Sequence, residues 1–175
     1  MSLDKPLGGG YKRRMNFRDR ASIFLATGLS IGKIPIAPGT FGTLLGFPIC
    51  FGLAELGAVG SIAGVVAFVL LAVWLADRAE HLIGKKDASA IVIDEVAGMM
   101  VTLAGLPLTP LNLAAGFVAF RFMDVTKPFP ASQIDRKMGG GWGVVMDDVV
   151  AGIYSNIFLR AISLFFFQGA AASAG

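Results

Sequence analysis

Charged residues are excluded from three long stretches of the chain, and this exclusion constrains the fold more than any other feature. Residues 41–76 carry only Glu55, and residues 96–120 carry no charge at all. After Asp148 the only charge is Arg160. A bilayer requires the backbone hydrogen bonds of an apolar segment to be satisfied within that segment, which favours helices over open strands. We therefore expect an all-α fold, a multihelical bundle embedded in a membrane with polar loops at one face.

The first apolar block predicts a helical hairpin. Its arms are expected at residues 44–59 and 61–76, joined by a glycine-containing turn at residues 57–60. Each arm is slightly shorter than the roughly 20 residues that cross a hydrocarbon core. The arms are therefore either short helices or spans that include flanking residues.

The second and third blocks predict the remaining helices. Residues 96–120 are interrupted by Pro107 and Pro110, which oppose helix continuation and leave either one kinked span or a re-entrant helical pair. Residues 149–167 are long enough for one span. The Gly/Ala/Ser tail at 169–175 is predicted to be disordered.

The chain shows no linker or internal repeat, so we expect one domain over residues 1–175 that begins with a basic segment at 1–27. Five basic side chains in this segment suit an anionic leaflet: Lys12, Arg13, Arg14, Arg18 and Arg20. The segment lacks the interleaved aromatic residues of a nucleic-acid site, and it lacks the apolar core and cleavage site of a signal peptide. We expect a membrane partner and no nucleic acid. The sequence does not specify an oligomeric state.

Most of the remaining Lys and Arg residues lie in two polar stretches, residues 77–95 and 121–148. The positive-inside rule places both stretches and the N-terminal segment on the cytoplasmic side. The arms of each hairpin then return to one face, where the three charged regions can converge.

Most acidic residues lie at this proposed cytoplasmic face. Two adjacent pairs and two single aspartates stand out: Asp94-Glu95, Asp147-Asp148, Asp124 and Asp135. Acids before an apolar helix are commonly dipole-stabilising caps, which is the alternative for either pair alone. Like charges gathered near a bilayer, however, repel and resist desolvation unless a cation compensates them. Carboxylates without His or Cys select Mg²⁺, with Mn²⁺ or Ca²⁺ as competitors.

Basic residues flank one of these acids at helical spacing. Arg121, Asp124 and Lys127 recur every three residues and share one face of a continued helix. The row is either a surface ion-pair ladder of little energetic weight or a pair of phosphate clamps beside a metal-bound carboxylate.

A glycine-rich segment at residues 32–43 precedes the first hairpin and supplies Lys33, Thr40 and Thr43. The threonines can donate to phosphate or cap the following helix. The spacing from Gly28 to Lys33 is one residue too short for a Walker A loop, so a nucleotide-binding P-loop is not expected.

Taken together, these segments resemble the phosphatidylglycerophosphatase A family. The resemblance rests on the P-x-x-P-G-T-x-G-T run at residues 35–43, on Asp94-Glu95 followed by Gly98, and on a long signature over residues 121–152. It implies a multihelical, Mg²⁺-dependent enzyme that hydrolyses phosphatidylglycerophosphate to phosphatidylglycerol and phosphate. Family membership alone does not establish membrane insertion, which rests on the apolar blocks. From these blocks and the positive-inside rule we expect a multi-pass protein of the bacterial inner membrane, with its active site facing the cytoplasm.

The resemblance also assigns roles to residues. The catalytic acids are Asp94, Glu95, Asp124, Asp147 and Asp148, and the metal ligands among them are Asp94, Glu95, Asp124 and Asp148. The expected phosphate-binding residues are Arg121, Lys127 and Arg136. To these the glycine-rich segment adds Lys33, Thr40 and Thr43. The attacking group is either a metal-positioned water or an aspartate that forms an aspartyl-phosphate.

A small cation transporter or channel component is the main alternative, because acids beside membrane helices also coordinate translocating cations. Its acids should lie inside the spans. Glu55 is the only acid within an apolar block, and the others gather at block ends, which favours interfacial chemistry. A purely structural scaffold would leave the paired acids without a role.

Overall fold

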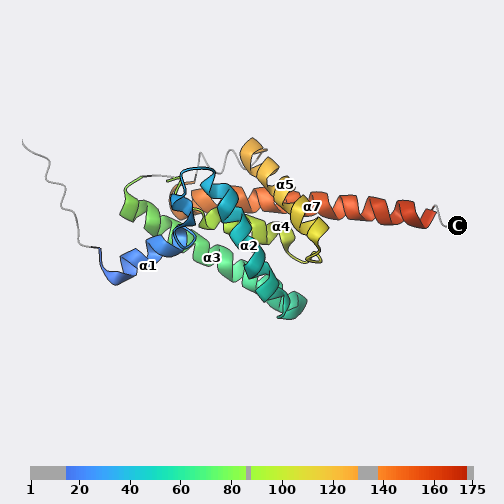
Figure 1. Ribbon diagram of the computed structural model, residues 1–175, viewed down its shortest axis with the longest axis horizontal. Helices are drawn as coiled ribbons and strands as arrows, with labels where there is room; N and C mark the ends of the chain where they lie inside the picture. Colours follow the sequence, from blue (N-terminus) through green and yellow to red (C-terminus); the bar gives the residue numbers. More distant parts are fainter. Residues whose placement is uncertain (1–14, 86–87, 130–137, 173–175) are drawn as a thin grey trace, which may run out of the picture.

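The computed structural model describes residues 15–85, 88–129 and 138–172, with side chains described as far as residue 165. Within these residues the chain forms six α-helices and one short 3-10 helix, and no strand. In chain order they are α1 (Phe17–Ala26), η1 (Ile31–Lys33), α2 (Pro38–Ala54), α3 (Gly57–Ile83), α4 (Ile93–Leu103), α5 (Pro110–Thr126) and α7 (Gly140–Ala172) (Figure 1). The all-α prediction is confirmed for this part of the chain.

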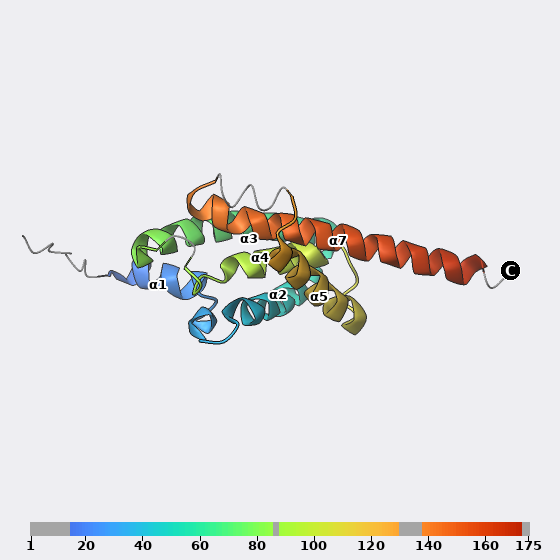
Figure 2. The ribbon, with the colours of Figure 1, turned by 90° about the horizontal axis from the view of Figure 1, so that it is seen from above.

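The short helix α4 lies at the centre of the bundle and contacts α2, α3, α5 and α7. Figure 2 shows it between α3 and α7 on one side and α2 and α5 on the other. Ile93 and Ala97 join a core with α1, α3 and α7, whereas Met99 and Met100 join a second core with α2 and α5. Because α4 has 11 residues, it is about 16 Å long, too short to cross a bilayer alone.

Two glycines bring the backbones of α4 and α7 into close contact. A Cβ at Gly152 would lie 2.5 Å from the carbonyl oxygen of Gly98, and one at Gly98 would lie 2.8 Å from that of Asp148. Gly98 follows Asp94 by four residues, and Gly152 follows Asp148 by four. Residues four apart share a helix face, so this contact directs Asp94 and Asp148 toward each other.

The C-terminal end of α4 is capped by side chains from α7. Asn156 Nδ2 donates to the carbonyl oxygens of Thr102 at 2.8 Å and Ala104 at 3.0 Å. Arg160 Nη2 also donates to Ala104, and Arg160 Nε holds the Asn156 amide oxygen at 2.8 Å. The last carbonyls of a helix have no partner within the helix, so these contacts allow α4 to end among apolar neighbours.

The start of α7 is tied to the end of α3. The backbone N–H of Gly141 donates to Asp77 Oδ1 at 3.2 Å. One residue further along α3, Arg78 pairs with Asp19 of α1 at 2.8 Å. Asp19 is itself fixed by a reciprocal capping box with Asn16. These contacts place the ends of α1, α3 and α7 at one side of the bundle.

The predicted hairpin is present as α2 and α3, but its turn lies earlier. The helices are separated by Glu55 and Leu56, and Gly57 is already the first residue of α3. Helix α2 starts at Pro38, where the fixed φ of proline suits the first helical position, so the first arm is shifted toward the N-terminus. Helix α3 continues past the predicted end at residue 76 to Ile83, where Gly84 in the left-handed conformation ends it.

The second block forms two separate helices, α4 and α5, rather than one kinked span. Pro110 is the first residue of α5 and Thr109 caps it, which accounts for the break. Helix α7 begins at Gly140, nine residues before the predicted start. It runs to Ala172, into the tail predicted to be disordered, where alanines favour helix. Residues 173–175 and the basic residues Lys12, Arg13 and Arg14 lie outside the described part.

Two described helices are long and apolar enough to cross a membrane, Gly57–Ile83 and Gly140–Phe165. Only 22% and 28% of their most apolar windows are buried inside the protein. A core helix of a soluble protein would be mostly buried, so the exposed apolar surface of these helices, which includes Leu70 and Trp74, favours contact with lipid.

Asn156→Leu is expected to lower the free energy of unfolding by about 2 kcal/mol, because it removes the side-chain donor to the Thr102 carbonyl and one of the two donors to the Ala104 carbonyl. Thermal unfolding in detergent micelles measures this. Asn112→Leu, which removes one exposed bond to Pro107, is the matched control and should cost less than about 1 kcal/mol. Equal losses for the two variants would contradict the capping role.

Candidate active site

A small polar cavity opens where α4 begins, α5 ends and α7 passes. It has a volume of about 100 Å³ and is lined by Asp94, Glu95, Asp124, Lys127, Val144, Asp147 and Asp148. Five of these seven residues are acids that the sequence analysis predicts to be catalytic. Residues from both polar stretches therefore converge, as predicted.

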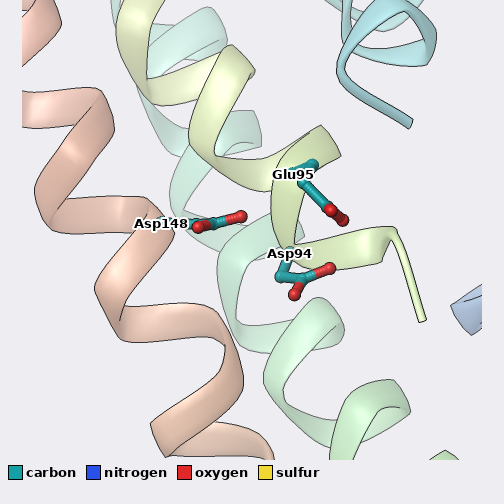
Figure 3. Close-up of side chains that lie close together, drawn as sticks. All are labelled: Asp94, Glu95 and Asp148. Atoms are coloured by element: carbon teal, nitrogen blue, oxygen red, sulfur yellow. The ribbon is translucent and has the colours of Figure 1, made fainter. Parts of the chain in front are cut away.

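Three of the acids face one another closely enough to share a cation. Asp94, Glu95 and Asp148 each offer a carboxylate oxygen, and these oxygens lie within 4.8 Å of one another. Figure 3 shows Asp148 reaching from α7 toward Asp94 and Glu95 in the first turn of α4. Asp94 Oδ1, Glu95 Oε2 and Asp148 Oδ2 are buried without a hydrogen-bond partner. Buried oxygens of this kind are ready to accept a cation.

Burial disfavours the charged forms of the two acids on α4. The pKa of Asp94 is raised well above its usual value, chiefly by burial and then by the neighbouring charges of Glu95 and Asp148. The pKa of Glu95 is also raised, mainly by burial, although Asp94 and Arg121 partly oppose the shift. The site therefore disfavours negative charge unless a positive charge enters it.

The capping alternative does not hold for the pair on α7. Asp147 and Asp148 were expected immediately before a helix, but α7 begins at Gly140, so both lie inside it. A carboxylate two turns into a helix cannot reach the free N–H groups of the first turn. In α4 the N-cap residue is Val92, and Asp94 and Glu95 follow in the first turn.

Two cations border the cavity, each paired with an acid. Arg121 Nη1 donates to Asp124 Oδ2 at 2.6 Å, and Lys127 Nζ donates to Asp147 Oδ2 at 2.6 Å. Lys127 caps α5 with a left-handed backbone, φ 42°, which ends the helix beside α7. The predicted row of Arg121, Asp124 and Lys127 thus lies on the α5 side of the acidic cavity, with Asp124 and Lys127 in its lining, rather than forming a ladder on an open surface.

The start of α2 lies close to one of the same acids, Glu95. A Cβ on Gly39 would be 3.2 Å from the Glu95 carboxyl carbon and 3.3 Å from Arg121 Nη1. Only glycine leaves room for this approach. No contact of this glycine was predicted from the sequence. Its place between Pro38 and Thr40, at the start of a helix where glycine is not needed as a cap, was the available signal.

The other predicted phosphate-binding residues are less well placed. Thr43 is fully buried, and its hydroxyl donates to the Gly39 carbonyl at 2.9 Å, so the structure does not support it as a phosphate ligand. Lys33 is exposed and lines a different groove with residues of α1. Thr40 is half-buried near the start of α2 but does not line the acidic cavity. Arg136 and Asp135 lie outside the described residues.

Comparison with known proteins identifies the family. A family model described as phosphatidylglycerophosphatase A matches residues 24–163. The chain belongs to the phosphatidylglycerophosphatase A family. The matched region includes every acid of the cavity, so the geometry above describes a site within the family's shared domain. No solved structure matches the chain.

Members of the phosphatidylglycerophosphatase A family from two bacteria resemble the chain over most of its length. The Escherichia coli K12 protein is 38% identical over 132 residues, 75% of this chain and 77% of that protein. The Haemophilus influenzae protein is 38% identical over 146 residues, 79% of this chain and 86% of that protein. A Bacteroides thetaiotaomicron protein, provisionally named phosphatidylinositol-3-phosphatase, is 34% identical over 145 residues, 78% of this chain and 90% of that protein.

Without divalent cations, the contribution of Asp94 to the stability of the protein should fall as pH rises above about 4. The raised pKa means that folded Asp94 keeps its proton to a higher pH than the unfolded chain does, so deprotonation favours unfolding. Asp94→Asn keeps the shape of the side chain and removes the cost of burying its negative charge. In EDTA at pH 7 it should raise the melting temperature by roughly 2–4 °C, about 1 kcal/mol.

The control for this measurement is Glu55→Gln, at an exposed acid outside the cavity, which should leave the melting temperature unchanged. A lower melting temperature for Asp94→Asn in EDTA would show that the Asp94 carboxylate stabilises the fold, against this account.

Gly39→Ala should reduce phosphatase activity by at least about tenfold, equivalent to about 1.4 kcal/mol, because the new methyl group displaces the Glu95 carboxylate. The matched control is Gly52→Ala on the same helix, where a Cβ meets nothing within 4 Å. Initial rates of phosphate release measure both. Full activity of Gly39→Ala would mean that the Glu95 position does not matter for turnover.

Proposed function

We propose that this chain hydrolyses phosphatidylglycerophosphate to phosphatidylglycerol and inorganic phosphate at a membrane surface. The observation that supports this most strongly is the cavity in which the carboxylates of Asp94, Glu95 and Asp148 face one another. Lys127 lines this cavity, and Arg121 lies beside it, paired with Asp124. Such a site suits a phosphomonoester, whose dianion needs both a metal and basic side chains to neutralise it. The family and the names of the Escherichia coli and Haemophilus influenzae relatives support this substrate.

We further propose Mg²⁺ as the cofactor, held by Asp94, Glu95 and Asp148. The residues fit this ion, because all donors are carboxylate oxygens and three buried oxygens lack other partners. Asp124 lines the same cavity and is available as a further ligand. When bound, the ion would neutralise phosphoryl oxygens and lower the pKa of an attacking water.

The basic side chains would bind the phosphate. Arg121 and Lys127 already point at carboxylates that line the cavity, so an arriving phosphate needs to displace one ion pair rather than recruit a distant side chain. Arg121 presents a planar fork that matches two phosphoryl oxygens, whereas Lys127 supplies a point charge. Asp124 and Asp147 would hold these cations in place before the substrate enters.

The reaction breaks the bond between phosphorus and the glycerol oxygen. The incoming water supplies a hydroxyl group to phosphorus, and its proton is balanced by protonation of the departing glycerol oxygen. A carboxylate of the cavity either receives the water proton or attacks phosphorus itself, in which case water releases the phosphate in a second step.

We propose a multi-pass protein of the bacterial inner membrane with this cavity on the cytoplasmic face. Helices α3 and α7 are the candidate spans, and the end of α3 lies beside the start of α7 through the Asp77 contact. The acidic cavity lies along the first turns of α7, near the basic residues that the positive-inside rule assigns to the cytoplasm.

Purified protein should release phosphate from phosphatidylglycerophosphate in mixed micelles with Mg²⁺. EDTA should abolish the release and added Mg²⁺ should restore it, because the cavity has no softer ligand that would favour zinc. A colorimetric phosphate assay follows the reaction. Undiminished turnover in metal-free buffer would contradict the metal assignment, and no release under either condition would contradict the substrate.

Asn in place of Asp94, Asp124 or Asp148 should lower kcat/KM by at least about 10²-fold, roughly 2.7 kcal/mol. Asn preserves size but removes a charge that the transition state requires. Glu55→Gln, at an exposed acid, is the expected near-neutral control. If all three variants keep near wild-type turnover at saturating Mg²⁺ while remaining folded, the cavity is not the active site.

A further inference from the structure

A long apolar groove runs between α5 and α7 and has no role in the chemistry above. Its volume is about 1120 Å³. On α5 its wall includes Leu111, Ala115, Val118 and Phe122, which recur at helical spacing along one face. On α7 its wall includes Phe158, Leu159, Ile162 and Ser163. No charged side chain among the described residues lines this groove, so an ionic, water-soluble ligand does not suit it.

The groove and the acidic cavity both reach the C-terminal end of α5. Met123 lines the groove and the next residue, Asp124, lines the cavity. A ligand that places a phosphate beside Asp124 therefore has one end of the apolar groove close to its headgroup, on the neighbouring face of the same helical turn. This proximity separates the groove from other exposed apolar surfaces of the molecule, such as the outer face of α3.

The length of the groove matches the hydrophobic part of a lipid. Met123 follows Leu111 by twelve residues, which corresponds to about 18 Å along a helix. One leaflet contributes about 15 Å of hydrocarbon to a bilayer. The side chains on its rim are open to the surroundings, since Leu111 is 76% and Val118 66% exposed. A chain can therefore enter sideways from the bilayer without passing through the protein.

We propose that the α5–α7 groove binds one acyl chain of the lipid substrate and thereby delivers its phosphate to the acidic cavity. The inference rests on the proposed hydrolysis of phosphatidylglycerophosphate. Binding energy from the acyl chain, remote from the reacting phosphorus, would position the headgroup between Arg121 and the carboxylates. The second acyl chain would remain in the surrounding lipid. The enzyme would then discriminate substrates by chain length as well as by headgroup.

The test compares long-chain and short-chain phosphatidylglycerophosphate, with sixteen-carbon and four-carbon acyl groups respectively. Two variants narrow the groove from opposite walls: Ala115→Phe on α5 and Ser163→Phe on α7. Ala67→Phe is the matched control, because Ala67 is exposed on α3 outside the groove. Initial rates in mixed micelles give kcat/KM for each lipid.

Wild type and Ala67→Phe should prefer the long-chain lipid. Each groove variant should lose about tenfold in kcat/KM for that lipid and stay within about twofold of wild type for the short-chain lipid. Tenfold corresponds to about 1.4 kcal/mol, less than the burial of two methylene groups provides. Retained short-chain turnover shows that the variant is folded and that its chemistry is intact.

Three results would overturn the inference while leaving the hydrolysis in place: no change for the long-chain lipid, an equal loss for both lipids, or a shift from a larger to a smaller oligomer without a chain-length effect. The last would identify the groove as a contact between copies of the chain. Failure of wild type to release phosphate from either lipid would instead contradict the proposed function.

Discussion

The close approach of α4 and α7 at Gly98 and Gly152 is the contact on which the candidate site depends. Any side chain at either position would push the helices apart. Because Asp94 and Asp148 each stand one turn before the contact, separation of the helices would also separate their carboxylates. Small residues at a helix crossing are typical of packing in membranes, where the hydrophobic effect does not drive helices together. Here the glycine contact between α4 and α7 also brings the carboxylates of Asp94 and Asp148 together.

Gathering these carboxylates is unfavourable for the isolated chain. Asp94 and Asp148 are 8% and 4% exposed, and buried like charges both repel one another and lose hydration. The fold compensates with well-satisfied contacts elsewhere, among them the Asn156 contacts at the end of α4. Local instability of this kind is common at functional sites, where stability is exchanged for activity. A divalent cation would convert the repulsion into attraction.

Much of this architecture could be predicted from the sequence. Long stretches without charge indicate helices in an apolar environment, and the positions of prolines indicate where these helices begin or break. The five acids of the cavity were singled out from the sequence because paired carboxylates gathered at one face repel one another, and the structure places these five side chains together. Helix boundaries were less predictable. Asp147 and Asp148 were expected before a helix because the apolar run begins after them, yet α7 starts at Gly140, where Asp77 of α3 supplies a cap from 64 residues away.

Side-chain roles that depend on tertiary contact were also missed. Thr43 has the chemistry of a phosphate ligand, but its hydroxyl is used within α2. Gly39 has no functional group, yet its missing side chain lets the start of α2 reach Glu95. Neither outcome follows from residue type or spacing, because each depends on which surface α2 presents to α4.

The central claim is that the buried carboxylates act together as one cation site. Electron paramagnetic resonance of Mn²⁺ added to the purified protein tests this directly, because bound and free Mn²⁺ give distinct signals and Mn²⁺ accepts the same oxygen ligands as Mg²⁺. Wild type and Glu55→Gln should bind Mn²⁺ and release it to excess Mg²⁺, whereas Asp148→Asn should weaken binding at least about tenfold. Equal Mn²⁺ binding by wild type and Asp148→Asn, or no binding by either, would contradict the account.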